Sequence, residues 1–98
     1  MIVGCLRLHL QLPGCGSLKE KRGRLKPLLH RMRRTFNIAA AETNHHDVWQ
    51  SAEISVVTLS NDNGHIQRRL EKIIAWIEES QTDLVLIEER MEVITGWS

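Results

Sequence analysis

An α+β fold, with two helices packed on one face of an antiparallel sheet, is predicted for this chain by three features of its sequence. Its 98 residues suit a single domain, 1–98, and an apolar fraction of 42% can supply one core. Residues 2–12 alternate between apolar and polar side chains, as a half-buried strand does. Two longer stretches, 18–36 and 66–77, repeat their apolar residues at helical spacing. Strand-like segments at 38–44, 49–59 and 83–94 complete the order βαββαβ.

The first strand predicts a buried face and an open face of the sheet. The open face would carry Cys5, Arg7 and His9, because alternate side chains of a strand point to opposite sides. Pro13 and Gly14 end the strand, since both residue types interrupt strand pairing. The face expected in the core carries four leucines: Leu6, Leu8, Leu10 and Leu12.

The first helix is predicted to begin at Ser17. Ser17 and Glu20 have the spacing of a capping box, in which each side chain bonds to the backbone N–H of the other residue. Pro27 removes one hydrogen bond inside the helix, yet both halves keep the helical pattern. We expect the helix to end near Asn37, which tolerates the left-handed conformation. Its apolar stripe consists of Leu18, Leu25, Leu28, Leu29, Met32 and Phe36.

The second half of the chain repeats this plan with weaker signals. Residues 38–44 are small and have low strand propensity, which favours an edge strand, whereas 49–59 have stronger strand character. Asp62 or Asn63 would cap the second helix, which we expect to end near Ser80. The register of the last strand stays open, because apolar residues occupy both of its faces. One face has Val85, Ile87, Met91 and Val93, and the other has Leu84 and Leu86.

This order of elements, with two βαβ halves of similar length, is that of a ferredoxin-like α+β sandwich. Right-handed crossovers would place both helices on one face of a four-stranded antiparallel sheet. The opposite face, with Arg7, His9, Glu53 and Ser55, would be left to water or to a partner.

Charge is distributed unevenly along the chain. Residues 1–36 contain nine Lys or Arg and one acid, a net charge of +8. Residues 37–98 contain four Lys or Arg and eleven acids, a net charge of −7. The total of +1 therefore hides a strongly dipolar molecule, and its basic part favours contact with a polyanion.

The basic residues concentrate in the first helix, around its apolar stripe. Lysine and arginine neutralise phosphates and release counterions, so this helix is a candidate surface for RNA. The structural alternative is a solvated helix face, or pairing with the acidic half of the same or a neighbouring chain. The candidate RNA-binding residues are Lys19, Lys21, Arg22, Arg24, Arg31, Arg33 and Arg34, and Lys26 belongs to the same run.

The sequence contains no motif that indicates catalysis, a cofactor or a metal. The glycine-rich turn before Ser17 has the spacing of neither a P-loop nor a dinucleotide fingerprint. Neighbouring histidines in a loop rarely point the same way, and no nucleophile or pocket is implied beside them. We therefore expect no enzyme activity, no cofactor and no metal. The weak candidates set aside here are Glu42, His45, His46 and Asp47.

The aromatic residues limit the kinds of RNA contact that this chain can make. A sheet face that stacks RNA bases needs aromatic residues, and this chain has one Phe and no Tyr. Any RNA contact is therefore expected through the helix and the RNA backbone, without base readout of RNA or DNA. Trp49 and Trp76 are expected at the core edge or at an interface. Cys5 is expected to be a small strand residue, and Cys15 an oxidisable loop thiol.

The sequence favours a cytoplasmic protein without membrane contact. No apolar stretch reaches the length of about 18 residues that a spanning helix needs. The first residues alternate and lack the basic region and cleavage site of a signal peptide. Two cysteines without a C-x-x-C spacing fit a reducing compartment.

Two blocks of residues resemble a known family. The first block is Leu12-Pro13-Gly14 followed by Ser17-Leu18-Lys19-Glu20-Lys21-Arg22, and the second is Ala41-Glu42 followed by His46-x-x-Trp49-Gln50-x-Ala52. Together they resemble the YlxP-like family of bacterial proteins of unknown function, over nearly the whole chain. Cys15 and the tail Thr95–Ser98, with Trp97, depart from the shared pattern.

The resemblance implies a ferredoxin-like fold and a cytoplasmic protein. The family's genes often neighbour those for transcription-elongation, initiation-factor and ribosome-maturation proteins, which suggests work on RNA or the ribosome. The resemblance brings no catalytic residue.

The sequence thus predicts a non-enzymatic accessory factor that contacts structured RNA or a ribosomal subunit through its first helix. The alternative is a homo-oligomeric interaction module or a small-ligand module. It would use the weak strand 38–44 and the open face around Arg7 and His9. The opposite charges of the two halves could also join two copies into a homodimer.

Overall fold

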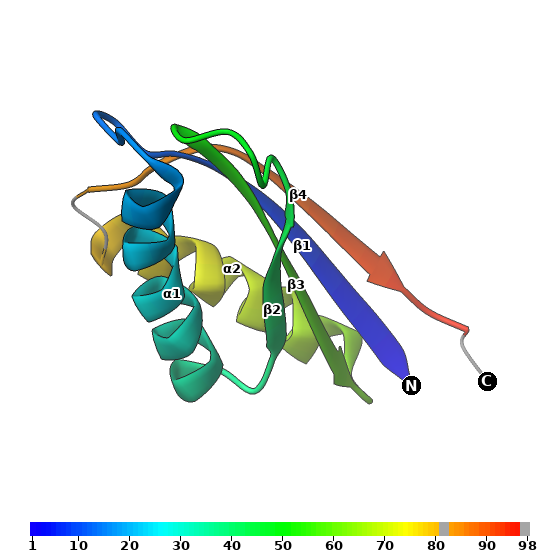
Figure 1. The fold of residues 1–98 in the computed structure, drawn as a ribbon. Coiled ribbons are helices and arrows are strands. Elements are labelled where there is room, and N and C mark those ends of the chain that lie inside the picture. Colours follow the sequence, from blue (N-terminus) through cyan, green and yellow to red (C-terminus); the bar gives the residue numbers. More distant parts are fainter. Residues whose placement is uncertain (81–82, 97–98) are drawn as a thin grey trace.

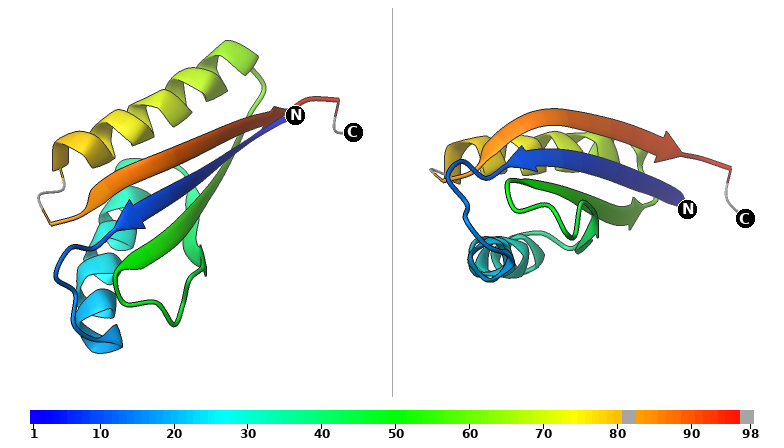
Figure 2. Two further views of the ribbon diagram at one scale, coloured as in Figure 1. Left: turned by 90° about the horizontal axis from the view of Figure 1, so that it is seen from above. Right: turned by 45° about the horizontal axis from the view of Figure 1, so that its top comes forward.

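The computed structural model describes residues 1–80 and 83–96, and it has the predicted order βαββαβ (Figure 1). Neighbouring strands are antiparallel and lie in the spatial order β2-β3-β1-β4, so β2 and β4 form the edges. Both helices cover one face of the sheet (Figure 2). The ferredoxin-like prediction is confirmed, and Trp97 lies outside the described residues. The elements are β1 (Ile2–Gln11), α1 (Leu18–Thr35), β2 (Ala39–Asn44), β3 (Ser51–Ser60), α2 (Asn63–Ser80) and β4 (Val85–Ile94).

The alternation of β1 positions the core as predicted. Its leucine face is fully buried and packs in one cluster with the apolar stripes of both helices. Arg7 and His9 lie on the other face, paired with Ser55 and Glu53 of β3. At Gly4 the sheet and α2 approach closely, since a Cβ there would lie 3.0 Å from Ile66 Cγ1.

A bulge settles the register of β4 that the sequence left open. Between His9 and Leu10 of β1, the pairing shifts from Glu88 to Leu86, which leaves Ile87 unpaired and exposed. One extra residue moves the following side chains to the other face of a strand. Both apolar alternations in the sequence therefore reach the core, one on each side of the bulge. The core-facing residues here are Leu84, Leu86, Met91 and Val93.

Helix α1 begins at the predicted cap, with one difference. Ser17 Oγ accepts a hydrogen bond from the backbone N–H of Glu20 at 3.0 Å. The Glu20 carboxylate accepts from the N–H of Gly16 at 2.6 Å, and not from Ser17 as predicted. This bond to Gly16, helped by the nearby charge of Arg24, holds the pKa of Glu20 below its ordinary value.

The end of α1 differs from the prediction. The helix ends at Thr35, and Phe36 follows in an extended conformation with its N–H bonded to the carbonyl of Met32 at 2.9 Å. Among the described residues, His45 is the one non-glycine with a positive φ, so the left-handed terminator predicted at Asn37 is wrong. Extended Phe36 instead directs its ring edge-on to Trp76, with ring centroids 5.8 Å apart.

Cys15 is buried, so the prediction of an oxidisable loop thiol is wrong. Its side chain is 1% exposed, and its Sγ donates to the carbonyl of Ser17 at 3.4 Å. Gly14 has a φ of 71°, a conformation that glycine adopts without strain, and it turns the chain so that Cys15 joins the core. A turn has no periodic pattern, so its buried residue gave no sequence signal.

Candidate nucleic-acid interface

The seven candidate RNA-binding residues fall into different environments on α1. Lys21 is buried, and Arg24 and Arg33 donate to backbone carbonyls of neighbouring segments. The sequence pattern placed all of them on one basic surface, whereas the structure brings only part of that set together. The remaining members, Lys19, Arg22, Arg31 and Arg34, are exposed.

Lys21 departs most clearly from the predicted surface. Its side chain is 2% exposed, and its ammonium nitrogen lies 2.7 Å from Oε2 of Glu42 in β2. The same Nζ donates to the carbonyls of His45 at 2.6 Å and Val48 at 2.7 Å. Two carbonyls and one carboxylate surround this buried ammonium, so Lys21 is not accessible to a phosphate. Its predicted place on the basic surface of α1 is wrong, because Lys21 is buried on the same side of the helix as Leu25, Leu28 and Met32.

The Lys21–Glu42 ion pair joins the two sequence blocks that carried the family resemblance. Lys21 belongs to the first block, and Glu42 and the loop 45–50 belong to the second. The N–H of Leu12 also donates to the carbonyl of Gln50 at 2.9 Å, which ties the same loop to the end of β1. The loop is thereby held from two sides, with His45 at a φ of 62° and Trp49 47% exposed.

Arg24 and Arg33 tie α1 to its surroundings. Arg24 Nη1 donates to the carbonyls of Pro13 at 3.0 Å and Asp83 at 3.4 Å. Arg33 donates through Nη2 at 2.6 Å and Nε at 3.2 Å to the carbonyl of Ala40. Ala40 lies in the edge strand β2, and bonding to an edge carbonyl hinders the addition of another strand. Both arginines therefore have structural partners that the sequence pattern did not reveal.

The outward surface of α1 keeps a run of cations, with the exposed His30 between Lys26 and Arg34. Lys19, Arg22, Lys26 and Arg34 are exposed, and none has a hydrogen bond or ion pair within the part of the chain that the structure describes. The single acid of the helix, Glu20, lies in its first turn. With a rise of about 1.5 Å per residue, the run extends over about 22 Å. Such a surface can neutralise several phosphates at once.

A second group of cations lies beside the end of α1, and sequence reasoning missed it. Residues from the first half of α2 and residues 35–37 line a groove of about 370 Å³. The sequence does contain a signal for this group, namely basic residues at helical spacing within residues 65–72. It was hidden because these residues lie in the half of the chain with a net charge of −7. The α2 residues of the groove are His65, Arg68, Arg69 and Lys72.

The cations of this groove are not equivalent. Arg69 is half-buried, and its Nη1 donates to Oγ1 of Thr58 at 2.7 Å. Arg68 and Lys72 are exposed. The pKa of the nearby Asp62 is held below its ordinary value by the N–H of His65 and by the charge of Arg68. Among the Lys and Arg residues of this groove, Arg68 and Lys72 are therefore the exposed ones, and His65 is exposed beside them.

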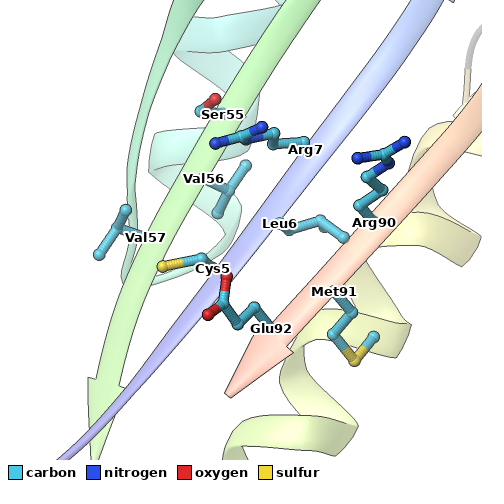
Figure 3. Close-up of a pocket in the computed structure, with 9 residues that line it drawn as sticks. All are labelled: Cys5, Leu6, Arg7, Ser55, Val56, Val57, Arg90, Met91 and Glu92. Carbon is cyan, nitrogen blue, oxygen red and sulfur yellow. The ribbon is translucent and has the colours of Figure 1, made fainter. Parts of the chain in front are cut away.

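The open face of the sheet contains a shallow groove of about 640 Å³ over β3, β1 and β4 (Figure 3). Arg7 of β1 pairs with Arg90 of β4 in one row across the sheet. The next row holds Glu53, His9 and Glu88. The prediction that Arg7 and His9 lie on the sheet face opposite the helices is confirmed. Arg7 is exposed there, whereas His9 is half-buried, with the ring of His45 edge-on at a centroid distance of 5.3 Å and Ser51 Oγ 2.7 Å from its Nε2.

The side chains of residues 42–47 have separate partners. His45 Nδ1 lies 2.9 Å from Oγ of Ser51, and His46 Nε2 lies 3.2 Å from the carbonyl of Glu42, whose carboxylate faces Lys21. Across residues 1–80 and 83–96, no three His, Cys, Asp or Glu side chains are grouped so as to hold a metal ion. Within the same ranges, no helix has the length and apolar character needed to cross a membrane.

The fold and surfaces define a small ferredoxin-like α+β domain with a cationic first helix and a sheet face that no helix covers. The chain belongs to a family of proteins of unknown function, DUF503, whose model matches residues 3–91. It is 33% identical over 77 residues to the uncharacterized protein YlxP of Bacillus subtilis (strain 168). The matched residues cover 79% of this chain and 84% of that protein. The membership predicted from the two sequence blocks is confirmed.

Proposed function

We propose that this protein is a non-enzymatic, cytoplasmic accessory factor that binds structured RNA, such as the RNA of a ribosomal subunit. The observation that carries the proposal is the exposed run of Lys19, Arg22, Lys26 and Arg34, none of which has a partner within the described residues. A cation already paired within the fold would gain less from a phosphate, so unpaired cations are the ones that contribute to binding.

Charge placement supports contact through the helix layer. Helix α1 packs beside the edge strand β2, and β4 is the other edge of the sheet (Figure 1). The exposed acids of β4 therefore lie away from α1. A molecule with such a separation is oriented by the field of a polyanion before contact. The exposed acids of β4 are Glu88, Glu89 and Glu92.

The proposal is tested by fluorescence anisotropy with a labelled, structured RNA and the full chain. The four α1 cations release counterions when they contact phosphates, so they alone should contribute about −3 to −4 to the slope of the logarithm of the binding constant against the logarithm of salt concentration. Titrations from about 50 mM to about 300 mM salt measure that slope. A chain that does not bind at the lowest salt, or binds equally at every salt, would contradict the proposal and favour an acidic protein partner.

A second candidate function, self-association with another copy of this chain, is favoured by the open sheet face. Val57 and Leu59 are exposed there, Leu59 at 62%. Arg7 has no hydrogen bond or ion pair among the described residues, and the row of Glu53 and Glu88 lies beside it. A two-fold axis between two faces would place Arg7 of one copy on the glutamate row of its partner. Within each copy, Arg90 already pairs with Glu88 of that row, with Nε 3.1 Å from Oε1.

The area of this face is sufficient for a dimer. Three strands of 10 residues and one of 6 make up the sheet. At about 3.3 Å per residue and about 4.8 Å between strands, they cover roughly 600 Å² per copy. Two copies would bury roughly 1,200 Å², the lower end of the range for specific interfaces.

Sedimentation equilibrium separates this candidate from a monomer. The wild-type chain is expected to form a dimer that Arg7→Glu weakens at least tenfold, because a like charge would then face the glutamate row. Lys26→Glu changes the net charge equally but lies on the helix layer, so it should leave the dimer intact. A monomeric wild type at about 100 μM, or an unchanged Arg7→Glu dimer, would exclude this interface.

A further inference from the structure

We infer that the groove between the end of α1 and the first half of α2 binds phosphates of double-helical RNA that lies along α1. This inference rests on the proposed RNA binding and adds a second contact site and a substrate class to it. The groove presents the exposed side chains of Arg68 and Lys72, one helical turn apart, beside residues 35–37 of the neighbouring segment.

The groove is built so that its exposed cations stay on the surface. Arg69 supports its floor by donating to Thr58, and Thr58 Oγ1 in turn donates to the carbonyl of Asn37 at 3.0 Å. This chain of hydrogen bonds links α2, β3 and the segment after α1. Because Arg69 is engaged, Arg68 and Lys72 are left to meet a ligand, with Asp62 as the acid that partly offsets Arg68.

The distribution of cations favours a duplex over a single strand. The α1 run extends over about 22 Å, and the groove adds a separate cluster on a second helix. A duplex presents two phosphate strands in fixed positions, so two rigid clusters can bind both strands without ordering a flexible chain.

Aromatic side chains support the same choice. Proteins that bind single strands stack the bases on exposed aromatic rings. Phe36 lines the groove but is half-buried, with its ring edge-on to Trp76. Within the described residues, Trp49 is the one Phe or Trp with high exposure, and it lies in the loop 45–50 and does not line the groove. The groove can therefore contact phosphates but offers no exposed aromatic ring on which a base could stack.

The test compares an RNA duplex with a single strand of equal phosphate number, by anisotropy over a salt series. The wild-type chain should bind the duplex at least tenfold more tightly. Arg68→Gln with Lys72→Gln should reduce duplex affinity at least tenfold at about 100 mM salt and flatten the salt slope by about two units. The control, Gln11→Glu with Gln67→Glu, changes the net charge equally at exposed positions that do not line the groove and should bind nearly as the wild type does.

Each outcome separates the groove from the broader proposal. If the wild type binds no RNA, the proposed function fails and the inference fails with it. If the wild type binds but the Arg68/Lys72 variant keeps its affinity and slope, the groove is not a phosphate site. Equal affinity for the single strand, or a selective loss of binding in Trp49→Ala, would show base stacking and overturn the duplex assignment.

Discussion

Replacing Lys21 with methionine is expected to lower the free energy of unfolding by about 3 kcal/mol, because one member of a buried ion pair is removed and its partner stays. Glu42 would lose the ammonium 2.7 Å from its Oε2. The carbonyls of His45 and Val48 would each lose a donor at the same time. For a domain of this size, the melting temperature should fall by more than about 10 °C.

Denaturant unfolding with two control variants measures this effect. Lys19→Met removes an exposed lysine two residues away and should change stability by less than about 0.5 kcal/mol. Lys21→Met combined with Glu42→Leu removes both charges, so it should recover much of the loss, although the loop carbonyls stay without their donor. A single Lys21→Met variant as stable as Lys19→Met would show that the pair contributes nothing, and that solvent already screens Glu42.

Neutralising three exposed cations of α1 is expected to weaken RNA binding about a hundredfold at about 100 mM salt and to flatten the salt slope by roughly three units. The variant combines Lys19→Gln, Arg22→Gln and Arg34→Gln. None of these side chains has a hydrogen bond or ion pair among the described residues, so stability should stay within about 1 kcal/mol of the wild type. The loss of affinity would then result from lost contacts at the surface of α1 and not from unfolding.

A matched control distinguishes local contact from total charge. Gln11→Glu, Gln67→Glu and Thr95→Glu lower the net charge by the same three units at exposed positions outside α1 and outside the groove. This control should keep most of the affinity and nearly all of the slope. If the two triple variants bind equally well, then net charge governs binding and α1 is not the contact surface.

The sequence by itself determined the order of elements, the leucine face of β1 and the start of α1. These features depend on side-chain periodicity and on bonds between residues a few positions apart, and both are visible in a linear pattern. The alternation of residues 2–12 predicts the buried face, because the pleat of a strand allows only two directions. Ser17 and Glu20 predict the cap, because their partners are local.

The tertiary structure alone decided the register of β4 and the burial of Cys15. The bulge at Ile87 depends on pairing with β1, and no residue of β4 by itself indicates it. Cys15 enters the core because the turn at Gly14 folds it beneath the end of the sheet. Both outcomes require contacts between segments that are distant from each other in the sequence.

The candidate interface was also decided by tertiary contacts. Lys21 looked like the other cations of α1, yet Glu42 and the loop 45–50 lie against its side of the helix and surround its ammonium group. Arg68 and Lys72 lie in an acidic half of the chain, yet the crossover places them beside the end of α1. A charge pattern predicts that cations exist, but only packing decides which of them are buried, which are paired and which face a partner.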